Sequence, residues 1–156
     1  MEQVEIKNET ELGGLAKKLV SELLARESAG ALAIGLVGEL GAGKTTLVKY
    51  FLRELGVSES VLSPTFVLMK KYGLEEKKYK NAIHVDCYRL EDPVSALSAL
   101  GFSEILKNKN NLVLVEWAER IKDILPADTL WIELIYCEGE GRTVRVGSVN
   151  SAILKV

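Results

Sequence analysis

The chain has 156 residues, a net charge of −2 from 20 basic and 22 acidic side chains, and a hydrophobic content of 47%. These values predict one folded domain over residues 1–156 and exclude a disordered or collagen-like chain. The longest stretches without a charged residue have 11 residues, whereas a membrane-spanning helix needs about 20. The first residues, MEQVEIKNE, lack the features of a secretory signal, so we expect a cytoplasmic protein with no membrane association.

The small negative charge predicts no global attraction to nucleic acid, so contact with nucleic acid should be local or made through partners. Cys87 and Cys137 are the only cysteines, and His84 is the only histidine. Two distant thiols form neither a disulfide framework nor a metal cluster, and a single histidine excludes a multi-histidine metal site. A Ser-His or Cys-His mechanism would depend on His84 alone, and we set that chemistry aside.

Hydrophobic spacing predicts the first elements in chain order. Residues 4–7 alternate as in a strand, and apolar residues at helical spacing follow from 12 to 24. Asn8 and Thr10 are both candidate N-caps of this helix. Glu11 lies three residues after Asn8, as in a capping box.

The next two elements flank a glycine-rich loop. Residues 31–37 form a continuous apolar run, which is typical of a strand buried on both faces of a parallel sheet. A helix should follow from about Lys44 to Leu55, with Gly56 just past its end.

The rest of the chain predicts a hairpin, a helix and three more strands. Segments 66–72 and 82–85 flank a charged stretch and predict the hairpin, and Asp92 followed by Pro93 predicts the helix start. The further strands are expected over 111–116, 129–136 and 142–147. This order predicts an α/β fold of the phosphate-loop NTPase type, with a mixed central sheet, parallel strands at its centre and helices on both faces.

Lysines surround the expected hairpin tip, interleaved with Tyr72 and Tyr79. Lysine neutralises phosphate and tyrosine can stack on bases, so contact with nucleic acid is one interpretation. Glu75 and Glu76 interrupt the basic patch, which favours a solvated tip.

Residues 38–45, GELGAGKT, match the phosphate-loop pattern GxxxxGK[ST] at each fixed position, between a predicted strand and a predicted helix. Gly38, Gly41 and Gly43 permit backbone angles that let successive amides point toward a β-phosphate. The start of the helix adds the positive end of its dipole. The alternative is a glycine-rich turn that matches by chance, which the flanking strand and helix disfavour.

Side chains of this loop supply the remaining nucleotide contacts. The Lys44 ammonium can reach the β- and γ-phosphates, and the Thr45 hydroxyl can bind a Mg²⁺ ion that bridges them. Thr46 lies one residue further and should reach the α-phosphate. The predicted nucleotide-binding residues of the loop are Gly38, Glu39, Leu40, Gly41, Ala42, Gly43, Lys44, Thr45 and Thr46.

Two carboxylates end predicted strands and complete the set of candidate catalytic residues with Lys44. Glu116 ends the apolar strand 111–116, where a Walker B acidic residue holds Mg²⁺ directly or through water. Asp86 can face the metal or orient the attacking water. The alternative for each is a carboxylate that caps a neighbouring loop; the metal role is favoured for Glu116, and both interpretations stay open for Asp86. For His84 we expect a packed, hydrogen-bonded role.

Ser63, Pro64 and Thr65 occupy the position of a switch segment, whose hydroxyl would reach the γ-phosphate and metal. An ordinary proline-containing turn is the alternative. Trp117 directly follows Glu116 and can pack near the nucleotide or face a partner, although a core tryptophan is the more frequent case.

Five motifs follow one another along nearly the whole chain: TELG at 10–13, GELGAGKTT at 38–46, SPTF at 63–66, HVDCYR at 84–89 and EW at 116–117. Their order and spacing resemble the TsaE family, formerly YjeE, of bacterial ATPases in tRNA threonylcarbamoyladenosine biosynthesis. The resemblance implies a cytoplasmic ATPase that uses ATP and Mg²⁺. It implies action with the partners TsaB and TsaD in placing a threonylcarbamoyl group on the adenosine beside the tRNA anticodon. A partner would perform the transfer, and contact with tRNA would be indirect.

The resemblance also implies roles for single residues. Thr10 would contact the base or sugar of the nucleotide, residues 39–46 would hold its phosphates, and Arg142 would close over it. Thr45 and Glu116 would hold Mg²⁺, Asp86 would support the metal or the attacking water, and residues 63–65 would form the switch. Many relatives have a proline after the tryptophan, where this chain has Ala118.

Three other functions compete with an ATPase. A small kinase would use the same loop but usually needs an arginine-rich lid, and the six arginines of this chain are scattered. A GTPase would carry Asn-Lys-x-Asp, and residues 108–111 are Asn-Lys-Asn-Asn. A nucleotide-gated binding module with negligible turnover remains open.

Overall fold

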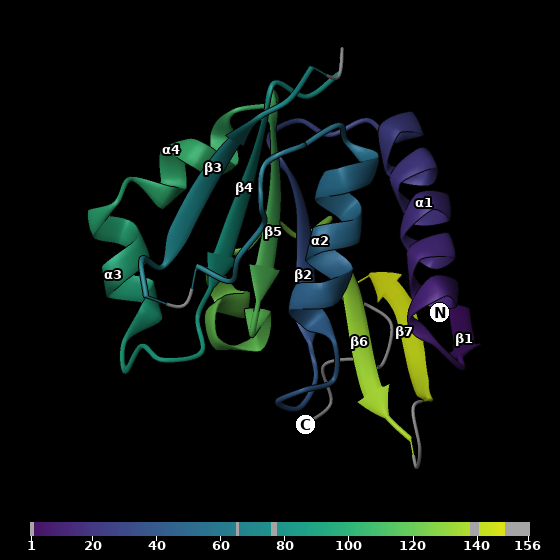
Figure 1. Ribbon diagram of the computed structural model, residues 1–156. Helices are drawn as coiled ribbons and strands as arrows, with labels where there is room; N and C mark the ends of the chain where they lie inside the picture. The colour runs from purple at the N-terminus through teal and green to yellow at the C-terminus, as the bar shows by residue number, and fades with distance from the viewer. Residues whose placement is uncertain (1, 65, 76–77, 138–140, 149–156) are drawn as a thin grey trace.

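The computed structural model describes residues 2–64, 66–75, 78–137 and 141–148. Within these ranges a seven-stranded mixed sheet forms the centre, and helices pack on both of its faces (Figure 1). This arrangement confirms the α/β class predicted from the sequence. The elements in chain order are β1 (Glu2–Ile6), α1 (Glu9–Ala25), β2 (Leu32–Val37), α2 (Lys44–Glu54), β3 (Met69–Gly73), β4 (Asn81–Asp86), α3 (Pro93–Ala99), α4 (Phe102–Lys107), β5 (Asn111–Glu116), the 3-10 segment η1 (Ala118–Ile124), β6 (Leu130–Tyr136) and β7 (Arg142–Ser148).

The strands lie in the order β1-β7-β6-β2-β5-β4-β3. The four central strands, β6, β2, β5 and β4, pair in parallel, and antiparallel strands complete both edges. Every residue of β2 and β5 is buried, as expected for strands covered on both faces. The strand that leads into the phosphate loop therefore lies at the centre of the sheet, between β5 and β6.

Two hydrophobic clusters separate the layers. Helices α1 and α2 cover one face, where Leu12 and Phe51 are fully buried against the sheet. The segments α3, α4 and η1 cover the other face, which buries Phe102 and Trp131. Among the residues that the structure describes, no helix combines the length and apolar character needed to cross a bilayer.

Helix starts follow the capping signals in the sequence. Of the two candidates for α1, Asn8 is the cap and Thr10 lies inside the helix: the Asn8 Oδ1 accepts a hydrogen bond from the Glu11 amide at 3.0 Å. The Glu11 carboxylate accepts the Lys7 amide at 2.8 Å, so the reciprocal bond goes one residue further back than in the usual capping box. Asp92 caps α3 through the amide three residues on, as predicted.

Two local differences from the prediction have clear causes. The hairpin of β3 and β4 is confirmed, but β3 begins at Met69 and not at residue 66. The Val67 amide bonds to the Pro64 carbonyl at 3.0 Å and Leu68 has φ 65°, so the chain turns before it becomes extended. The helix predicted after Asp92 is confirmed as α3, but Gly101, with φ 74°, is followed by a second helix, α4, that the sequence did not predict.

Candidate functional site

The loop of residues 38–43 joins the buried end of β2 to the start of α2. Gly38 has φ 139° and Gly43, the N-cap of α2, has φ 103°, which are backbone conformations that side chains with a Cβ rarely adopt. A Cβ on Gly43 would also collide with the Arg142 guanidinium. No side chain caps α2, so its first amides are available to an anion at the positive end of the helix dipole.

Lys44 is folded back onto this loop. Its Nζ donates to the carbonyl oxygens of Gly38 at 2.6 Å and Glu39 at 2.7 Å, and it lies 3.9 Å from the centroid of the Trp117 ring. Burial lowers the pKa of the Lys44 ammonium, and the carboxylates of Glu116, Glu119 and Asp86 oppose that effect. The predicted phosphate-binding cation is therefore present at the site, in a desolvated position among acidic groups.

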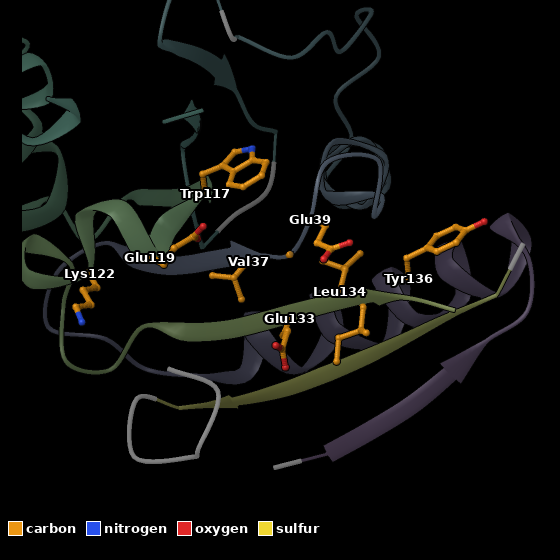
Figure 2. Close-up of a pocket in the computed structure, with 10 residues that line it drawn as sticks. Val37, Glu39, Trp117, Glu119, Lys122, Glu133, Leu134 and Tyr136 are labelled. Atoms are coloured by element: carbon orange, nitrogen blue, oxygen red, sulfur yellow. The ribbon is translucent and has the colours of Figure 1, made fainter. Parts of the chain in front are cut away.

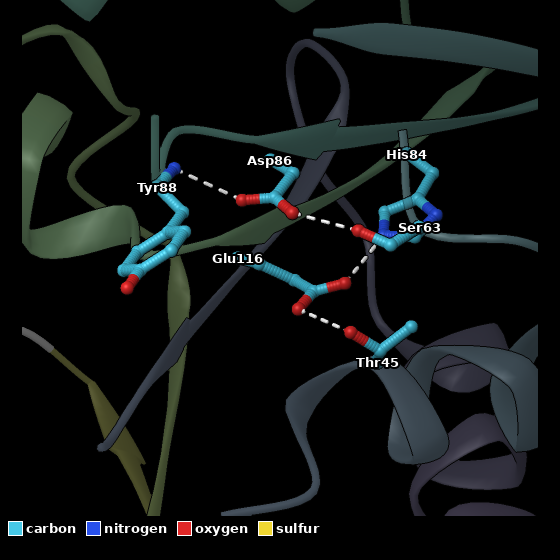
Figure 3. Close-up of polar contacts among 6 residues, drawn as sticks. All are labelled: Thr45, Ser63, His84, Asp86, Tyr88 and Glu116. Carbon is cyan, nitrogen blue, oxygen red and sulfur yellow. Dashed lines mark hydrogen bonds and ion pairs between the residues drawn. The ribbon is translucent and has the colours of Figure 1, made fainter. Parts of the chain in front are cut away.

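Glu116 connects three elements at the carboxyl end of β5 (Figure 3). Its Oε2 accepts a hydrogen bond from the Thr45 hydroxyl of α2 at 2.7 Å, and its Oε1 lies 2.8 Å from the His84 Nε2 of β4. Glu116 and His84 are both buried. The hydroxyl and the carboxylate predicted to share a metal are therefore in direct contact.

Asp86 lies beside Glu116, because the two are register partners at the ends of the parallel strands β4 and β5. The Ser63 hydroxyl donates to the Asp86 Oδ2 at 2.7 Å, and the Tyr88 amide donates to the Oδ1 at 2.9 Å (Figure 3). The predicted switch segment is thus tied to the second acidic residue. Pro64 is buried, and Thr65 lies outside the described residues.

A cavity of about 320 Å³ brings these groups together. It joins the phosphate loop and the first turn of α2 to the ends of β4 and β5. Its lining residues are Leu40, Gly41, Gly43, Lys44, Thr45, Thr46, Ser63, Asp86, Tyr88, Glu116 and Trp117.

Five predicted nucleotide-binding residues lie outside this lining: Gly38, Glu39 and Ala42 of the loop itself, and Thr10 and Arg142, which are distant in the sequence. Arg142, at the start of β7, donates from Nη1 to the Ala42 carbonyl at 3.4 Å and so contacts the phosphate loop itself. Thr10 is exposed in the first turn of α1. Their contact with a nucleotide stays a prediction.

Tyr88 is the cavity residue that sequence reasoning missed, whereas a position of Trp117 near the nucleotide was one of the interpretations left open. A core position was the more frequent expectation for Trp117, but it is only partly buried, and its ring stacks on Tyr88 with 4.8 Å between ring centroids. Its backbone is left-handed, with φ 58°, so the chain turns sharply where β5 ends. Its position directly after Glu116 was the available signal.

A second cavity, of about 740 Å³, is lined by the end of β2, the start of the phosphate loop, η1 and β6 (Figure 2). Burial raises the pKa of Glu119, one of three carboxylates in its lining, and Trp117 borders both cavities. The lining residues are Val37, Gly38, Glu39, Trp117, Glu119, Lys122, Glu133, Leu134, Ile135 and Tyr136.

The described part of the β3–β4 hairpin does not present an aromatic surface for nucleic acid. Tyr72 and Tyr79 are buried. Lys78 donates to the carbonyl oxygens of Leu24 and Arg26 at the end of α1. Residues 76 and 77 of the tip lie outside the described residues. These placements disfavour base stacking by the two tyrosines.

Comparison with known proteins identifies the family. The family model described as "Threonylcarbamoyl adenosine biosynthesis protein TsaE" matches residues 6–144. The chain belongs to the TsaE family. The TsaE protein of Haemophilus influenzae is 34% identical over 134 residues, covering 86% of this chain and 82% of that protein. The TsaE protein of Bacillus subtilis is 33% identical, covering 86% and 80%.

A solved structure supports the same fold. The crystal structure of Bacillus subtilis YdiB superimposes with a TM-score of 0.70 at 27% identity, covering 95% of this chain and 85% of that chain. The resemblance to the TsaE family that the sequence motifs indicated is therefore confirmed.

The donor atoms at this TsaE-family site fit the Mg²⁺ expected from the motifs. Thr45, Asp86 and Glu116 offer only oxygen atoms, which Mg²⁺ prefers. In the described part of the chain, no group of three or more His, Cys, Asp or Glu side chains could hold a metal ion. Mg²⁺ commonly binds through one or two carboxylates together with substrate phosphates, and this donor set suits that mode.

Proposed function

We propose that this protein binds and hydrolyses ATP with Mg²⁺ in the cavity between the phosphate loop and the ends of β4 and β5. The observation that carries the proposal is the 2.7 Å hydrogen bond between the Thr45 hydroxyl and the Glu116 carboxylate. It places the two oxygen groups typical of a phosphate-loop metal site in contact, next to Lys44 and an uncapped helix start.

The side chains have distinct roles in this proposal. The amides of residues 38–46 and the Lys44 ammonium bind the phosphates, for which Lys44 must leave its contacts with the loop carbonyls and the Trp117 ring. Thr45 and Glu116 hold Mg²⁺, which neutralises charge on the β- and γ-phosphates. Asp86 orients the attacking water or supports the metal.

Three further contacts belong to the same proposal. Ser63 couples the segment 63–65 to Asp86, so that the segment responds to the state of the nucleotide. Arg142 closes over the nucleotide from the side of the phosphate loop. Thr10 contacts its base or sugar.

The pathway proposal rests on the family. We propose that this chain acts in the cytoplasm with TsaD- and TsaB-type proteins to form the threonylcarbamoyl group on the adenosine next to the tRNA anticodon. A partner performs the transfer, and contact with tRNA is indirect.

Exposed apolar side chains beside the site support a protein partner. Leu62, Phe66 and Val67 are 66%, 85% and 65% exposed, on either side of Ser63 and Pro64. Exposed apolar groups that cluster in this way are typical of surfaces that a protein covers.

The test is nucleoside mass spectrometry of bulk tRNA from cells depleted of this protein and rescued with the intact chain or with Lys44→Ala. Lys71→Ala, which changes an exposed lysine of β3, is the matched control. We expect threonylcarbamoyladenosine to fall on depletion and to return with the intact chain and the control but not with Lys44→Ala. An unchanged level on depletion, in a strain without a second copy, would refute the pathway assignment.

A nucleotide-gated binding module is the second candidate. Both oxygens of Asp86 accept hydrogen bonds from the protein. This arrangement suits a carboxylate that holds the switch segment in place as well as it suits one that orients water.

A further inference from the structure

His84 lies on the strand beside Glu116, with its ring enclosed in the protein. It occupies the middle of β4, opposite Leu114 of β5 in the register, and its side chain has no exposed surface. Its neighbours on the same sheet face, Ala82 and Leu114, belong to the core cluster that packs under α1 and α2. A polar ring in such surroundings needs a hydrogen-bond partner to offset its desolvation.

That partner is the carboxylate of Glu116. The His84 Nε2 lies 2.8 Å from the Glu116 Oε1, while the His84 Nδ1 is buried without a hydrogen-bond partner among the described residues. The observed polar contact of the ring is therefore directed at one oxygen of Glu116. The other oxygen, Oε2, faces Thr45 at 2.7 Å.

The two contacts fix the carboxylate from opposite sides. Thr45 belongs to α2 and His84 to β4, so Glu116 is held between the helix on one face of the sheet and the strand beside it (Figure 3). If Mg²⁺ takes the Thr45 hydroxyl and the Oε2 as ligands, the Thr45 proton no longer bonds to Glu116. The contact with His84 then remains to keep the carboxylate from rotating away.

We propose that His84 is a positioning residue that holds Glu116 in the orientation required to bind Mg²⁺. The inference rests on the proposed function, because it concerns the metal of the same site. Hydrogen-bond partners of metal-binding carboxylates typically contribute about 10- to 100-fold to metal affinity. His84 acts through Glu116 and does not touch the nucleotide.

The test measures binding and not turnover. A fluorescent ADP analogue is titrated into the protein in EDTA and then at increasing Mg²⁺. His84→Leu removes the polar contact at similar volume, and His84→Gln keeps a donor at the distance of the Nε2. We expect His84→Leu to raise the Mg²⁺ concentration for half-maximal gain in affinity about 10-fold or more, with binding in EDTA unchanged and His84→Gln close to the wild type.

Two controls separate positioning from packing. Leu114→Ala disturbs the same buried layer but keeps both side chains of the His84–Glu116 contact, so it should lower the melting temperature and leave the Mg²⁺ dependence close to that of the wild type. If His84→Leu does not fold, His84→Asn replaces it, because its shorter amide does not reach Glu116.

Each outcome decides the question. A wild-type Mg²⁺ dependence in a folded His84→Leu or His84→Asn protein would overturn the positioning role, as would a folded His84→Gln protein that is as defective as they are. If the wild type binds the analogue equally well with and without Mg²⁺, the proposed metal site fails, and the role of His84 fails with it.

Discussion

The Lys44 ammonium lies over the Trp117 ring, with its Nζ 3.9 Å from the ring centroid. Such a contact is worth about 0.5 to 2 kcal/mol. Together with the carbonyl oxygens of Gly38 and Glu39, it gives a buried cation partners while no phosphate is bound. In the proposed function, a bound nucleotide would replace these contacts with contacts to phosphate oxygens.

Lys44→Met should separate binding from stability. Loss of charge-assisted hydrogen bonds to phosphate, at about 1.5 to 3 kcal/mol each, should weaken ATP affinity by about 10- to 150-fold. Burial already disfavours the Lys44 ammonium and lowers its pKa. Methionine removes that desolvation cost but also leaves the Gly38 and Glu39 carbonyl oxygens without their donor, so the two effects oppose each other and the melting temperature of the nucleotide-free protein should change little. Calorimetric titration and thermal unfolding check both results, and a clear loss of stability would contradict this account of Lys44.

Asp86→Asn should separate hydrolysis from binding. The amide keeps the size of the side chain but cannot orient a water as a base, so ATP turnover should fall by about 100-fold or more, while nucleotide affinity stays close to that of the wild type. Ser63→Ala is the companion variant, because it removes the bond to the Asp86 Oδ2 and keeps the carboxylate. Single-turnover hydrolysis and ADP titration give the two measurements. Full tRNA modification by Asp86→Asn, without turnover, would favour the nucleotide-gated module.

Phe66→Ser should weaken partner binding. Phe66 is 85% exposed, with the Arg89 guanidinium 4.8 Å from its ring, and a partner that covers it would bury a large apolar surface. Truncating such a side chain at the centre of an interface commonly costs about 2 kcal/mol or more, or roughly 30-fold in affinity. Leu100→Ser, at the end of α3, is the matched control. Pull-down of TsaD- and TsaB-type proteins measures the effect, and equal loss with both variants would argue against a specific surface.

The two thiols should react very differently. Burial raises the pKa of Cys87 to about 12, so its thiol stays protonated and unreactive at pH 8, whereas Cys137 is exposed. Mass spectrometry after iodoacetamide treatment should find Cys137 alkylated in the folded protein, and both cysteines alkylated in urea. Because the thiol ionises more readily in the unfolded chain, its contribution to stability is complete below its ordinary pKa of about 9 and is lost as the pH rises toward 12. Rapid labelling of Cys87 at pH 8 without denaturant would contradict its burial.

Much of the fold was readable from local sequence. The apolar runs of β2 and β5, the cap at Asp92 and the phosphate-loop pattern each depend on neighbouring residues, and all appear where they were expected. The proximity of Thr45 and Glu116 also followed, because a phosphate loop and the carboxyl end of a parallel strand share one edge of the sheet.

Long-range register was not readable in the same way. The bond between His84 and Glu116 depends on how β4 slides along β5, and no local pattern reports that shift. For Trp117 the sequence left the core, the nucleotide and a partner surface open, with the core favoured because large aromatic residues are usually buried there. The left-handed backbone at the end of β5 brings its ring to the site instead.

Because β2 lies at the centre of the sheet, its backbone amides should exchange with deuterium much more slowly than those of the loop that follows it. Strand β2 (Leu32–Val37) pairs with β5 on one side and β6 on the other, so its hydrogen-bonded amides exchange with deuterium only when the middle of the sheet opens. The loop of residues 38–43 is not part of the sheet, and its amides can exchange through small local openings. A bound nucleotide should therefore slow amide exchange in the loop, whereas exchange in β2 is already slow without nucleotide. The loop peptide would then report binding, and the neighbouring β2 peptide would serve as the internal reference in the same experiment.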